Sequence, residues 1–375
     1  MISIKNLHLT YHTDSGPVPA VRGVSIEIPS GGFHTLLGPS GCGKTSTLRC
    51  VAGLERPDSG EITLDGEIVF SSERGIYVPP YRRRLGMVFQ SYAIWPHMDV
   101  FGNVAYPLKY GGTTLPKGES IRDRVSEVLD MVGLRGLEKR PAPLLSGGQQ
   151  QRLALARALV ARAGVLLLDE PLSNLDARLR DEMRHEIREL TTRLRVTTLF
   201  VTHDQLEAFT MSDTIGVMNE GVLVQEGPPL SIYRSPTNQF VANFVGRSNV
   251  LEGKVCVAPD EDSGLGEVDT PVGTLTCQFD QRFATGEAVA VLLRPEDIEW
   301  PREEPGPGDH RDHSNVLECI VNEAMFLGPT YDIELEVRGQ VLKAIFPSHE
   351  AIDRGRKVTV HIPAHACHVM RKTAA

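Results

Sequence analysis

The stretch Gly38-Pro39-Ser40-Gly41-Cys42-Gly43-Lys44-Thr45 has the pattern G-x-x-x-x-G-K-T. Its glycines let backbone N–H groups turn inward toward phosphate oxygens, an approach that side chains would obstruct. Lys44 can reach the β- and γ-phosphates of a nucleotide, and the Thr45 hydroxyl can ligate Mg²⁺. The stretch therefore predicts a P-loop, and we count Ser46, which follows it, among the phosphate-binding residues.

The residues on either side of the loop fit this interpretation. Residues 32–37 read as a buried strand, and residues 45–52 read as a helix. The N-terminus of such a helix adds partial positive charge to an anion site. The alternative, a glycine-rich turn with no ligand, is disfavoured by the strand–loop–helix order.

Composition sets limits on the function. The chain has 375 residues, which predicts two or three domains, and 41% of them are hydrophobic. The net charge of −9 gives no electrostatic support to general nucleic-acid binding. The six cysteines form no C-x-x-C pair, which fits reduced thiols in a cytosolic protein. We expect no signal peptide and no membrane-spanning helix, because the apolar runs are shorter than the ~20 residues that spanning requires.

Two alternating segments, residues 3–10 and 21–28, predict an antiparallel β layer beside the P-loop core. Tyr11 stands at the end of the first segment. An exposed aromatic ring upstream of a P-loop can stack on adenine, but it can equally be a tyrosine that only ends a strand. Sequence reasoning leaves both interpretations open.

Residues 85–90 form a short apolar strand that ends in Gln90. The carboxyl ends of strands in open α/β sheets are where ligands bind, although Gln90 can also be an ordinary polar loop residue. Residues 91–109 are rich in aromatic side chains and are interrupted by Pro96 and Pro107. We expect this region to pack on a helical subdomain or to receive a partner.

A second glycine-rich helix start is Leu145-Ser146-Gly147-Gly148-Gln149. Ser146 with Gln149 three residues later is a capping-box pattern. The two glycines leave the start of the helix bare, which makes it a second potential phosphate site. Two such helix starts are explained if they face each other, within one molecule or across two.

Polar residues also follow two buried strands. Residues 165–168 are an apolar run, typical of a strand covered on both faces, and Asp169 and Glu170 come next. Asp169 suits Mg²⁺ coordination, and Glu170 can polarise an attacking water. Capping of the following helix is the weaker alternative for this pair. His203 ends the strand at 197–202 and can bond a γ-phosphate, although a lone histidine is more often structural.

From about residue 240 onward the pattern changes to short strands with frequent Gly and Pro, which predicts an all-β module, a small barrel, with a loop at 301–313. His361, His365 and Cys367 would share one face if the tail were a strand. We do not favour a metal site there, because no loop spacing supports it.

Together these motifs resemble, in content and order, the ATPase subunit of ABC transporters. The segment 145–149 is the specific element, because P-loop kinases and GTPases lack it. The resemblance covers about residues 1–233. The tail, with Gly246-Arg247-Ser248-Asn249 and Leu293-Arg294-Pro295-Glu296, resembles the accessory oligonucleotide-fold (TOBE-type) module of the maltose, polyamine and ferric-iron importer ATPases.

The resemblance implies a fold and a division of the chain. Residues 1–239 would be an α/β P-loop domain with a RecA-like core, an antiparallel β layer and a helical subdomain at about 91–163. Residues 240–375 would be an all-β, OB-like accessory domain.

The resemblance also implies roles for residues of the P-loop region. Tyr11 would stack on adenine, and residues 38–45 would hold the phosphates, with Lys44 also catalytic. Thr45, Gln90 and Asp169 would hold Mg²⁺, and Gln90 would link the nucleotide state to a membrane subunit. Glu170 would be the general base, and His203 would hold the γ-phosphate.

Further implied roles lie across a dimer. Ser146 and Gly148, within the set 146–149, would bind ATP held by a second copy, so that two copies enclose two ATP molecules. Asp176 would signal between the copies. Family members usually carry Ala where Asn174 stands. We expect this difference to have little consequence, and the property it could affect is coupling across the dimer.

The partners implied are two integral-membrane permease subunits and, indirectly, a solute-binding protein, with no nucleic acid. The chain would lie peripherally on the cytoplasmic face of the inner membrane, and residues 92–106 would receive a permease helix. Ferric iron is our hypothesis for the solute, with polyamine, sugar or organophosphate as alternatives. A soluble ABC ATPase without a transporter is the rival from another class, but the single cassette, the acidic balance and the lack of a long heptad run argue against it. A regulator that uses its β tail can coexist with transport.

Overall fold

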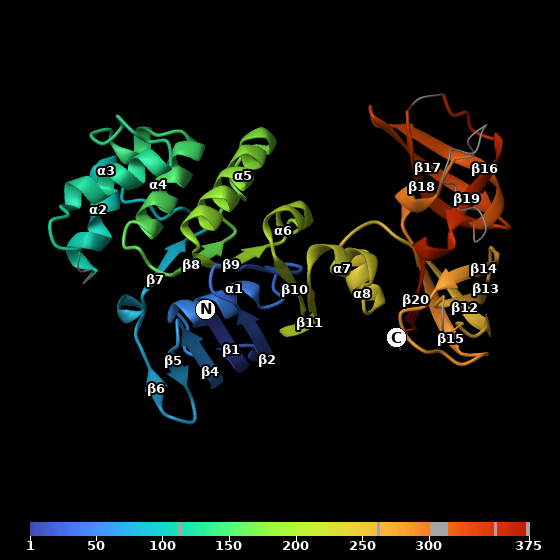
Figure 1. Ribbon diagram of the computed structural model, residues 1–375, viewed down its shortest axis with the longest axis horizontal. Helices are drawn as coiled ribbons and strands as arrows, with labels where there is room; N and C mark the ends of the chain where they lie inside the picture. Colours follow the sequence, from blue (N-terminus) through green and yellow to red (C-terminus); the bar gives the residue numbers. More distant parts are fainter. Residues whose placement is uncertain (112–114, 261–262, 301–313, 349–350, 373–375) are drawn as a thin grey trace. The chain divides into compact units, whose positions relative to one another are not determined.

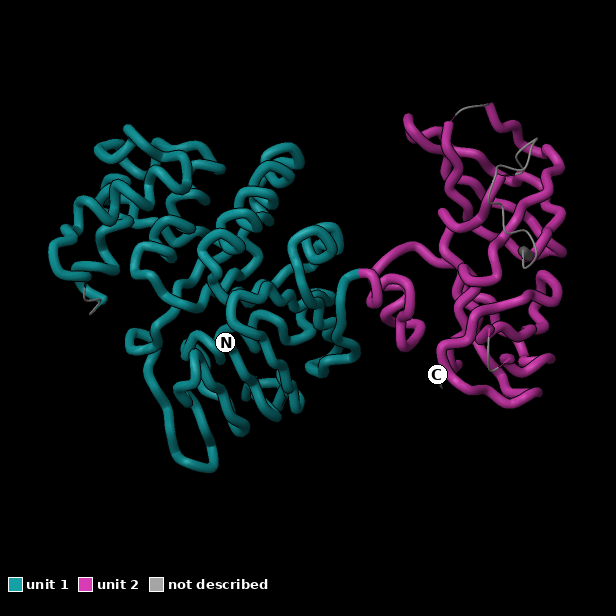
Figure 2. The backbone as a smooth tube through the Cα atoms, viewed as in Figure 1, with its two compact units in different colours: residues 1–229 teal, residues 230–375 magenta. Residues whose placement is uncertain are grey.

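The computed structural model describes residues 1–111, 115–260, 263–300, 314–348 and 351–372. The loop expected at 301–313 lies outside the described residues. The chain forms two compact units, residues 1–229 and 230–375 (Figure 2). The division falls earlier than the boundary expected after residue 239, because the helix α7 (Pro229–Arg234) is also bound to the second unit, through the pair of Arg234 with Asp297. The helix α8 (Gln239–Phe244) packs there through Ala242.

A six-stranded sheet forms the centre of unit 1. Its strand order is β11 (Val222–Gly227), β10 (Thr214–Asn219), β3 (Phe33–Leu37), β9 (Thr197–Thr202), β8 (Val165–Asp169) and β7 (Leu85–Val88). All neighbours are parallel except β10 and β11. Every residue of β3, β8 and β9 is buried, as expected for strands covered on both faces. Their carboxyl ends meet at one edge, and this edge carries the motifs.

The predicted antiparallel layer is confirmed. It contains β2 (Gly16–Ile28), β1 (Ile2–Thr13), β4 (Ser59–Leu64), β5 (Glu67–Ser71) and β6 (Ile76–Tyr77), in that order. The first hairpin extends beyond the expected segments, because residues 10–13 continue to pair with residues 16–19. Side chains of this layer pack on Leu48 and Val51 of the helix α1 (Lys44–Ala52). The layer therefore supports the helix that follows the P-loop.

Three helices form a separate group in unit 1, α2 (Val100–Tyr110), α3 (Ile121–Met131) and α4 (Gly147–Leu159) (Figure 1). Side chains of Asp99, Ser120 and Ser146 cap their N-termini, which explains where each helix begins. The remaining helices are α5 (Ala177–Leu194), capped by Asp176, and α6 (Gln205–Met211), capped by Asp204. Short 3₁₀ turns at Pro80–Arg82 and Ala142–Leu144 complete the unit. No helix in the described part of the chain is long and apolar enough to cross a membrane.

Unit 2 begins with α7 (Pro229–Arg234) and α8 and is otherwise built of strands. A closed barrel has the order β12 (Asn249–Val257), β13 (Leu265–Thr270), β14 (Gly273–Gln278), β20 (Cys367–Arg371) and β15 (Ala288–Leu293). A four-stranded sheet has the order β18 (Gln340–Pro347), β17 (Thr330–Val337), β16 (Ser314–Phe326) and β19 (Lys357–Pro363). Barrel and sheet share one hydrophobic core. The all-β prediction is confirmed, but the barrel is only half of the module.

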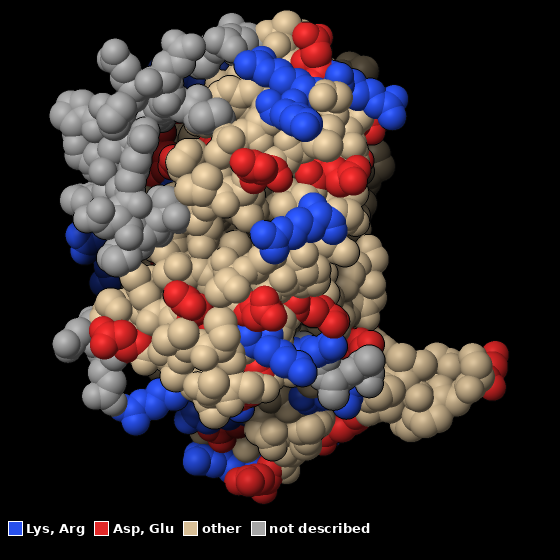
Figure 3. All heavy atoms as spheres, turned by 90° about the vertical axis from the view of Figure 1, so that its right-hand side faces the viewer, with Lys and Arg blue, Asp and Glu red and all other residues tan. Residues whose placement is uncertain are grey.

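The tail does not form the continuous strand on which a shared face of His361, His365 and Cys367 depended. β19 ends at Pro363, a 3₁₀ turn occupies Ala364–Ala366, and β20 begins at Cys367. Among the described residues, no group of three or more His, Cys, Asp or Glu side chains could hold a metal ion. Basic and acidic side chains are interspersed on the described part of the face in Figure 3.

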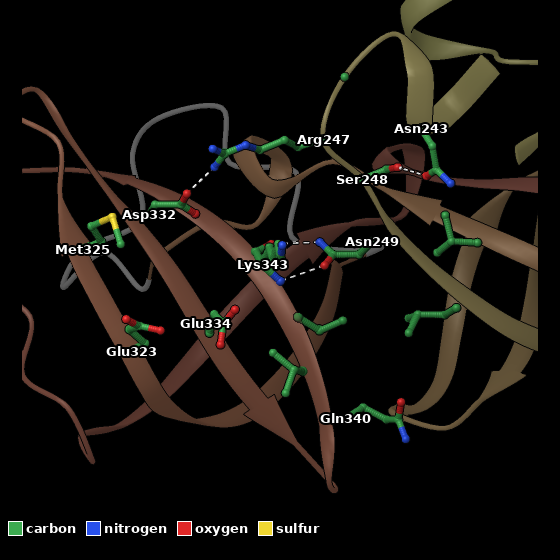
Figure 4. Close-up of a pocket in the computed structure, with 15 residues that line it drawn as sticks. Asn243, Arg247, Ser248, Asn249, Glu323, Met325, Asp332, Glu334, Gln340 and Lys343 are labelled. Atoms are coloured by element: carbon green, nitrogen blue, oxygen red, sulfur yellow. Dashed lines mark hydrogen bonds and ion pairs between the residues drawn. The ribbon is translucent and has the colours of Figure 1, made fainter. Parts of the chain in front are cut away.

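The two tail motifs hold unit 2 together. Asn249 exchanges two hydrogen bonds with the backbone of Lys343, at 2.7 and 2.8 Å, and Arg247 pairs with Asp332 above a hollow of about 530 Å³ (Figure 4). Arg294, 2% exposed, donates to the carbonyls of Ala242, Arg247 and Tyr233. Backbone groups bind the Asn249 amide and the terminal nitrogens of Arg294, although Nε of Arg294 has no hydrogen-bond partner among the described residues. The motifs therefore join the helices of unit 2 to its strands.

Candidate active site

The loop between β3 and α1 depends on glycine at defined positions. Gly43 has φ +102°, and a Cβ atom there would lie 2.1 Å from the Ala20 carbonyl oxygen. A Cβ atom at Gly38 would lie 2.4 Å from the Met218 carbonyl oxygen. Gly43 precedes α1 without any side chain capping the helix. The first N–H groups of α1 are therefore left for another acceptor, which is what a phosphate provides.

Lys44 closes the loop from inside. Its side chain is buried, and its ammonium group donates to the carbonyl oxygens of Gly38 at 2.8 Å and Pro39 at 2.9 Å. The Cys42 sulfur is 3.8 Å away, and burial raises the pKa of this thiol although Lys44 opposes the shift. The cation is held by neutral groups at the centre of the loop, so the loop fits a polyphosphate.

A hydroxyl and a carboxylate meet beside the loop. The Thr45 hydroxyl donates to the Asp169 carboxylate at 3.0 Å, which joins α1 to the end of β8. Asp169 is 6% exposed, and burial raises its pKa, while the Thr45 bond and the charges of Arg49 and Lys44 act in the opposite direction. Oxygen ligands of this kind fit Mg²⁺, and a cation would relieve the cost of burying the charge.

Glu170 lies at the meeting point of three strand ends. Its carboxylate accepts from the Gln90 side-chain amide at 3.2 Å and lies 3.2 Å from Nδ1 of His203. Its backbone is left-handed, with φ +43°, and its N–H donates to the Val201 carbonyl. Left-handed glutamate is strained, and strain of this kind gathers at functional sites. The geometry places one carboxylate between an amide and an imidazole at the sheet edge.

Tyr11 lies beside the first turn of α1. Its hydroxyl donates to the Ser46 hydroxyl at 3.3 Å, and its ring packs partly on the core shared by α1 and the antiparallel layer. This position is compatible with both interpretations of Tyr11, so its stacking on adenine stays a prediction.

The segment 145–149 stands apart from this group. The predicted capping box is confirmed, because the Ser146 hydroxyl accepts from the Gln149 N–H at 3.4 Å and the Gln149 side chain accepts from the Ser146 N–H at 3.1 Å. Ser146 and Gly147 are exposed. Within the part of the chain that the structure describes, no hydrogen bond or ion pair links residues 146–149 to the P-loop group. The P-loop group and the start of α4 are therefore two separate features of the chain, and their joint use in one site stays a prediction.

Sequence reasoning missed two contacts at the site. The Asn174 side chain donates to the Gln90 carbonyl at 2.9 Å. Asn174, whose difference from the Ala of the family was expected to matter little, thus holds the backbone of Gln90. Arg83 donates to the carbonyls of Cys50 and Val51, both at 2.7 Å, and so caps the C-terminus of α1. Both contacts join residues more than 30 positions apart, which no local pattern reveals.

Comparison with known proteins gives a consistent family. The family described as ABC transporter matches residues 21–173, and the family described as TOBE domain matches residues 291–370. The trehalose/maltose import ATP-binding protein of Thermococcus litoralis is 43% identical over 96% of this chain and 95% of its own. A spermidine/putrescine import ATP-binding protein of Rubrobacter xylanophilus is 47% identical over 84% and 78%. An Fe(3+) ions import ATP-binding protein of Photorhabdus laumondii is 43% identical over 86% and 84%.

Solved structures agree for the first part of the chain. A dimeric bacterial ABC transporter cassette superposes with a TM-score of 0.53 at 30% identity, covering 61% of this chain and 99% of that one. A cassette of a cbiONQ transporter complex from Clostridium perfringens gives a TM-score of 0.54 at 29% identity, covering 65% and 92%.

Proposed function

The chain belongs to the ATP-binding proteins of ABC transporters, and from this membership we propose that it hydrolyses ATP to energise solute import. The observation that carries the proposal is the gathering of Lys44, the Thr45–Asp169 pair and Glu170 at one edge of the parallel sheet. These are the groups that phosphate binding, cation binding and activation of water require.

Binding of ATP would use residues 38–46, through backbone N–H groups and the ammonium of Lys44, with Tyr11 against the base. Mg²⁺, when bound, neutralises charge on the phosphates. Thr45 and Asp169 would hold the ion, and Gln90 would complete the set.

Hydrolysis would depend on Glu170 as general base. The carboxylate would accept a proton from the attacking water, and its place at the carboxyl ends of the parallel strands supports this role. The Gln90 amide and Nδ1 of His203 both contact Oε2 of this carboxylate, 3.2 Å away in each case. His203 would turn to the γ-phosphate once a ligand is present. Charge stabilisation by fixed groups would supply most of the rate enhancement.

A second copy of the chain would complete each site. The start of α4 exposes Ser146 and Gly147, whereas Gly148, predicted to face the ATP of the other copy, is buried against Leu179. Among the described residues, this helix start forms no hydrogen bond or ion pair with the P-loop of its own chain. Apposition of two chains would place each such helix start on the phosphates held by the other. Asp176, which caps α5 beside Asn174, would signal between the copies.

A groove in unit 1 supports docking of a membrane subunit. Its volume is about 1030 Å³, and it lies between the 3₁₀ turn before β7 and the end of α2. Tyr81 and Tyr110 flank it and are 74% and 71% exposed. Tyr92, expected to belong to such a surface, is buried in the core instead. We propose that each copy receives a cytoplasmic segment of one permease subunit here and so lies peripherally on the inner membrane.

Ferric iron is our hypothesis for the solute, and polyamine, sugar or organophosphate are its alternatives. Relatives named for trehalose/maltose, spermidine/putrescine and Fe(3+) import align at 43%, 47% and 43% identity, so similarity does not choose among them. The selection would be made by the permease subunits and by a solute-binding protein.

The test is purification of the Glu170→Gln variant, with ATP, from membranes of the native host. Integral-membrane subunits together with a solute-binding protein are expected, and the ligand of that binding protein identifies the solute. A folded, ATP-bound dimer that brings no membrane protein would contradict the transport proposal and support a soluble ATPase.

A further inference from the structure

The segment that follows Gln90 has an unusual backbone. Tyr92 and Ala93 are consecutive non-glycine residues in the left-handed region, with φ +59° and +47°. Each such residue brings its Cβ atom too close to its own backbone, so two in succession are unfavourable. The turn is tight, because the Tyr92 N–H donates to Phe89 and the Ala93 N–H donates to Ser91. Contacts from elsewhere in the fold must hold this conformation.

Arg157 provides those contacts. Its guanidinium donates to the Tyr92 carbonyl at 2.7 Å and to the Ala93 carbonyl at 2.5 Å. The same group lies over the ring of Trp95, 4.7 Å from its centre. Arg157 is only 8% exposed, and within the described residues it forms no ion pair with a carboxylate. A buried charge held by two carbonyls and an aromatic face is costly, and here its partners are the strained residues.

The position of Arg157 joins the two halves of the site. It lies in the last turn of α4, the helix that begins at the segment 145–149. The C-terminus of α4 also packs tightly on β7, because a Cβ atom at Gly86 would lie 2.2 Å from the Ala158 carbonyl oxygen. β7 leads directly to Gln90, whose amide contacts Glu170. The guanidinium therefore links a rigid helix to the turn that aims Gln90.

We propose that Arg157 is a positioning residue, which holds the left-handed turn at Tyr92 and Ala93 and thereby places the Gln90 amide on Glu170. The inference rests on the proposed function for its catalytic consequence. The helix α4 carries the other half-site at its start. Arg157 therefore also couples the movement of that half-site to the movement of the Gln90 turn.

Arg124 is the matched control. It is also buried, at 5% exposure, and it donates to two carbonyls at the same end of α4, Val160 at 2.9 Å and Leu159 at 3.0 Å. Within the described residues, Arg124 forms no hydrogen bond or ion pair with the Gln90 turn, but it supports the same helix. Substitution of Arg124 thus measures how much stability is lost when a buried arginine is removed while the turn at Tyr92 and Ala93 keeps its contacts.

The chain has two tryptophans, Trp95 and Trp300. The experiment uses the full chain carrying Trp300→Phe, so that Trp95 is the single tryptophan that reports. Arg157→Met and Arg124→Met are compared by acrylamide quenching of Trp95 without nucleotide and by kcat and KM for ATP. We expect Arg157→Met to expose Trp95 and to lower kcat about 10-fold or more, with KM within about two-fold. Arg124→Met is expected to lower the thermal midpoint but to leave both readouts near the parent.

A second substitution keeps the test decisive if Arg157→Met does not fold. Arg157→Lys retains the positive charge and N–H donors but lacks the planar fork, so kcat should fall less than for Met. Adding Ala93→Gly, which removes the left-handed strain at that residue, should recover part of the lost kcat. Equal effects of the Arg157 and Arg124 variants, parallel changes in kcat and KM, or no recovery by Ala93→Gly would overturn the inference. A parent that does not hydrolyse ATP contradicts the proposed function instead, and the quenching measurement still tests the turn.

Discussion

The starts of α1 and α4 are both glycine-rich helix N-termini, and they differ in how their backbone donors are satisfied. At α1 the residue before the helix is a left-handed glycine with no side-chain cap, and the next residue is a buried lysine. At α4 Ser146 and Gln149 satisfy each other's N–H groups, and the surface around them is exposed. Among the described residues, the first start has no side-chain acceptor for its N–H groups, whereas the capping box of the second satisfies Ser146 and Gln149 and leaves the N–H groups of Gly147 and Gly148 for another molecule.

The chemistry follows the same division. Asp169, Glu170 and His203 gather beside α1, together with Gln90. Changes beside α1 should therefore alter the binding or hydrolysis of ATP by one chain. Changes at the start of α4 should leave ATP binding by a single chain intact and alter the assembly of two chains. Each prediction below tests that separation.

The largest expected effect is that of Glu170→Gln. Loss of the general base should reduce ATP hydrolysis about 10³-fold, while ATP affinity stays near the parent value because the phosphate-binding groups are unchanged. Steady-state phosphate release and equilibrium nucleotide binding measure the two quantities. Glu182→Gln, an exposed change on α5, is the control and should leave both unchanged. Hydrolysis near the parent rate would rule out Glu170 as the base.

Lys44→Ala should act on binding itself. A charge-assisted hydrogen bond is worth about 1.5–3 kcal/mol, so ATP affinity should fall roughly 10- to 100-fold. Calorimetry with the single chain measures it, and Lys5→Ala, an exposed change on β1, serves as the control. An unchanged affinity would remove Lys44 from the phosphate site.

A pair of glycine substitutions tests the two backbones directly. Gly43→Ala places a Cβ atom 2.1 Å from a backbone oxygen at φ +102° and should destabilise unit 1 by at least roughly 1–3 kcal/mol. Gly147→Ala meets only Leu175, at 3.8 Å, and should change stability by less than about 0.5 kcal/mol. Urea unfolding followed by Trp95 in the Trp300→Phe background measures both. Equal stability of the two variants would contradict the difference drawn between the helix starts.

Local sequence spacing was sufficient to predict the functional groups that lie on, or directly beside, a single helix or strand. The P-loop, the capping box at Ser146 and the acidic residues at the end of β8 follow from residues within a few positions of one another. Their gathering follows from parallel strands, whose carboxyl ends meet at one edge.

Contacts over long sequence separations were not predictable in this way. Arg157 bonds residues 64 and 65 positions away, and Asn174 bonds a carbonyl 84 positions away. In unit 2, the sequence pattern predicted an all-β module, but closure of its barrel depends on the pairing of Gln278 with His368. Such partners are chosen by tertiary packing, and the periodicity of a single segment carries no information about them.

The smallest expected effect belongs to Ser146→Ala. Loss of the cap should cost about 1 kcal/mol of stability, since one N–H of α4 loses its acceptor. The affinity of a single chain for ATP should stay within about two-fold of the parent, because in the described part of the chain no hydrogen bond joins Ser146 to the P-loop group. ATP-driven dimerisation, measured by analytical ultracentrifugation in the Glu170→Gln background, should weaken.

Ser120→Ala separates these two effects of Ser146. Ser120 caps α3 through the same kind of box, so its loss should cost similar stability. Because α3 carries no glycine-rich start, dimerisation should remain at the parent level in this variant. If Ser120→Ala weakens the dimer as much as Ser146→Ala, the start of α4 is only a helix cap and the second half of the site lies elsewhere. If only Ser146→Ala does so, the hydroxyl acts across the dimer in addition to closing its own helix.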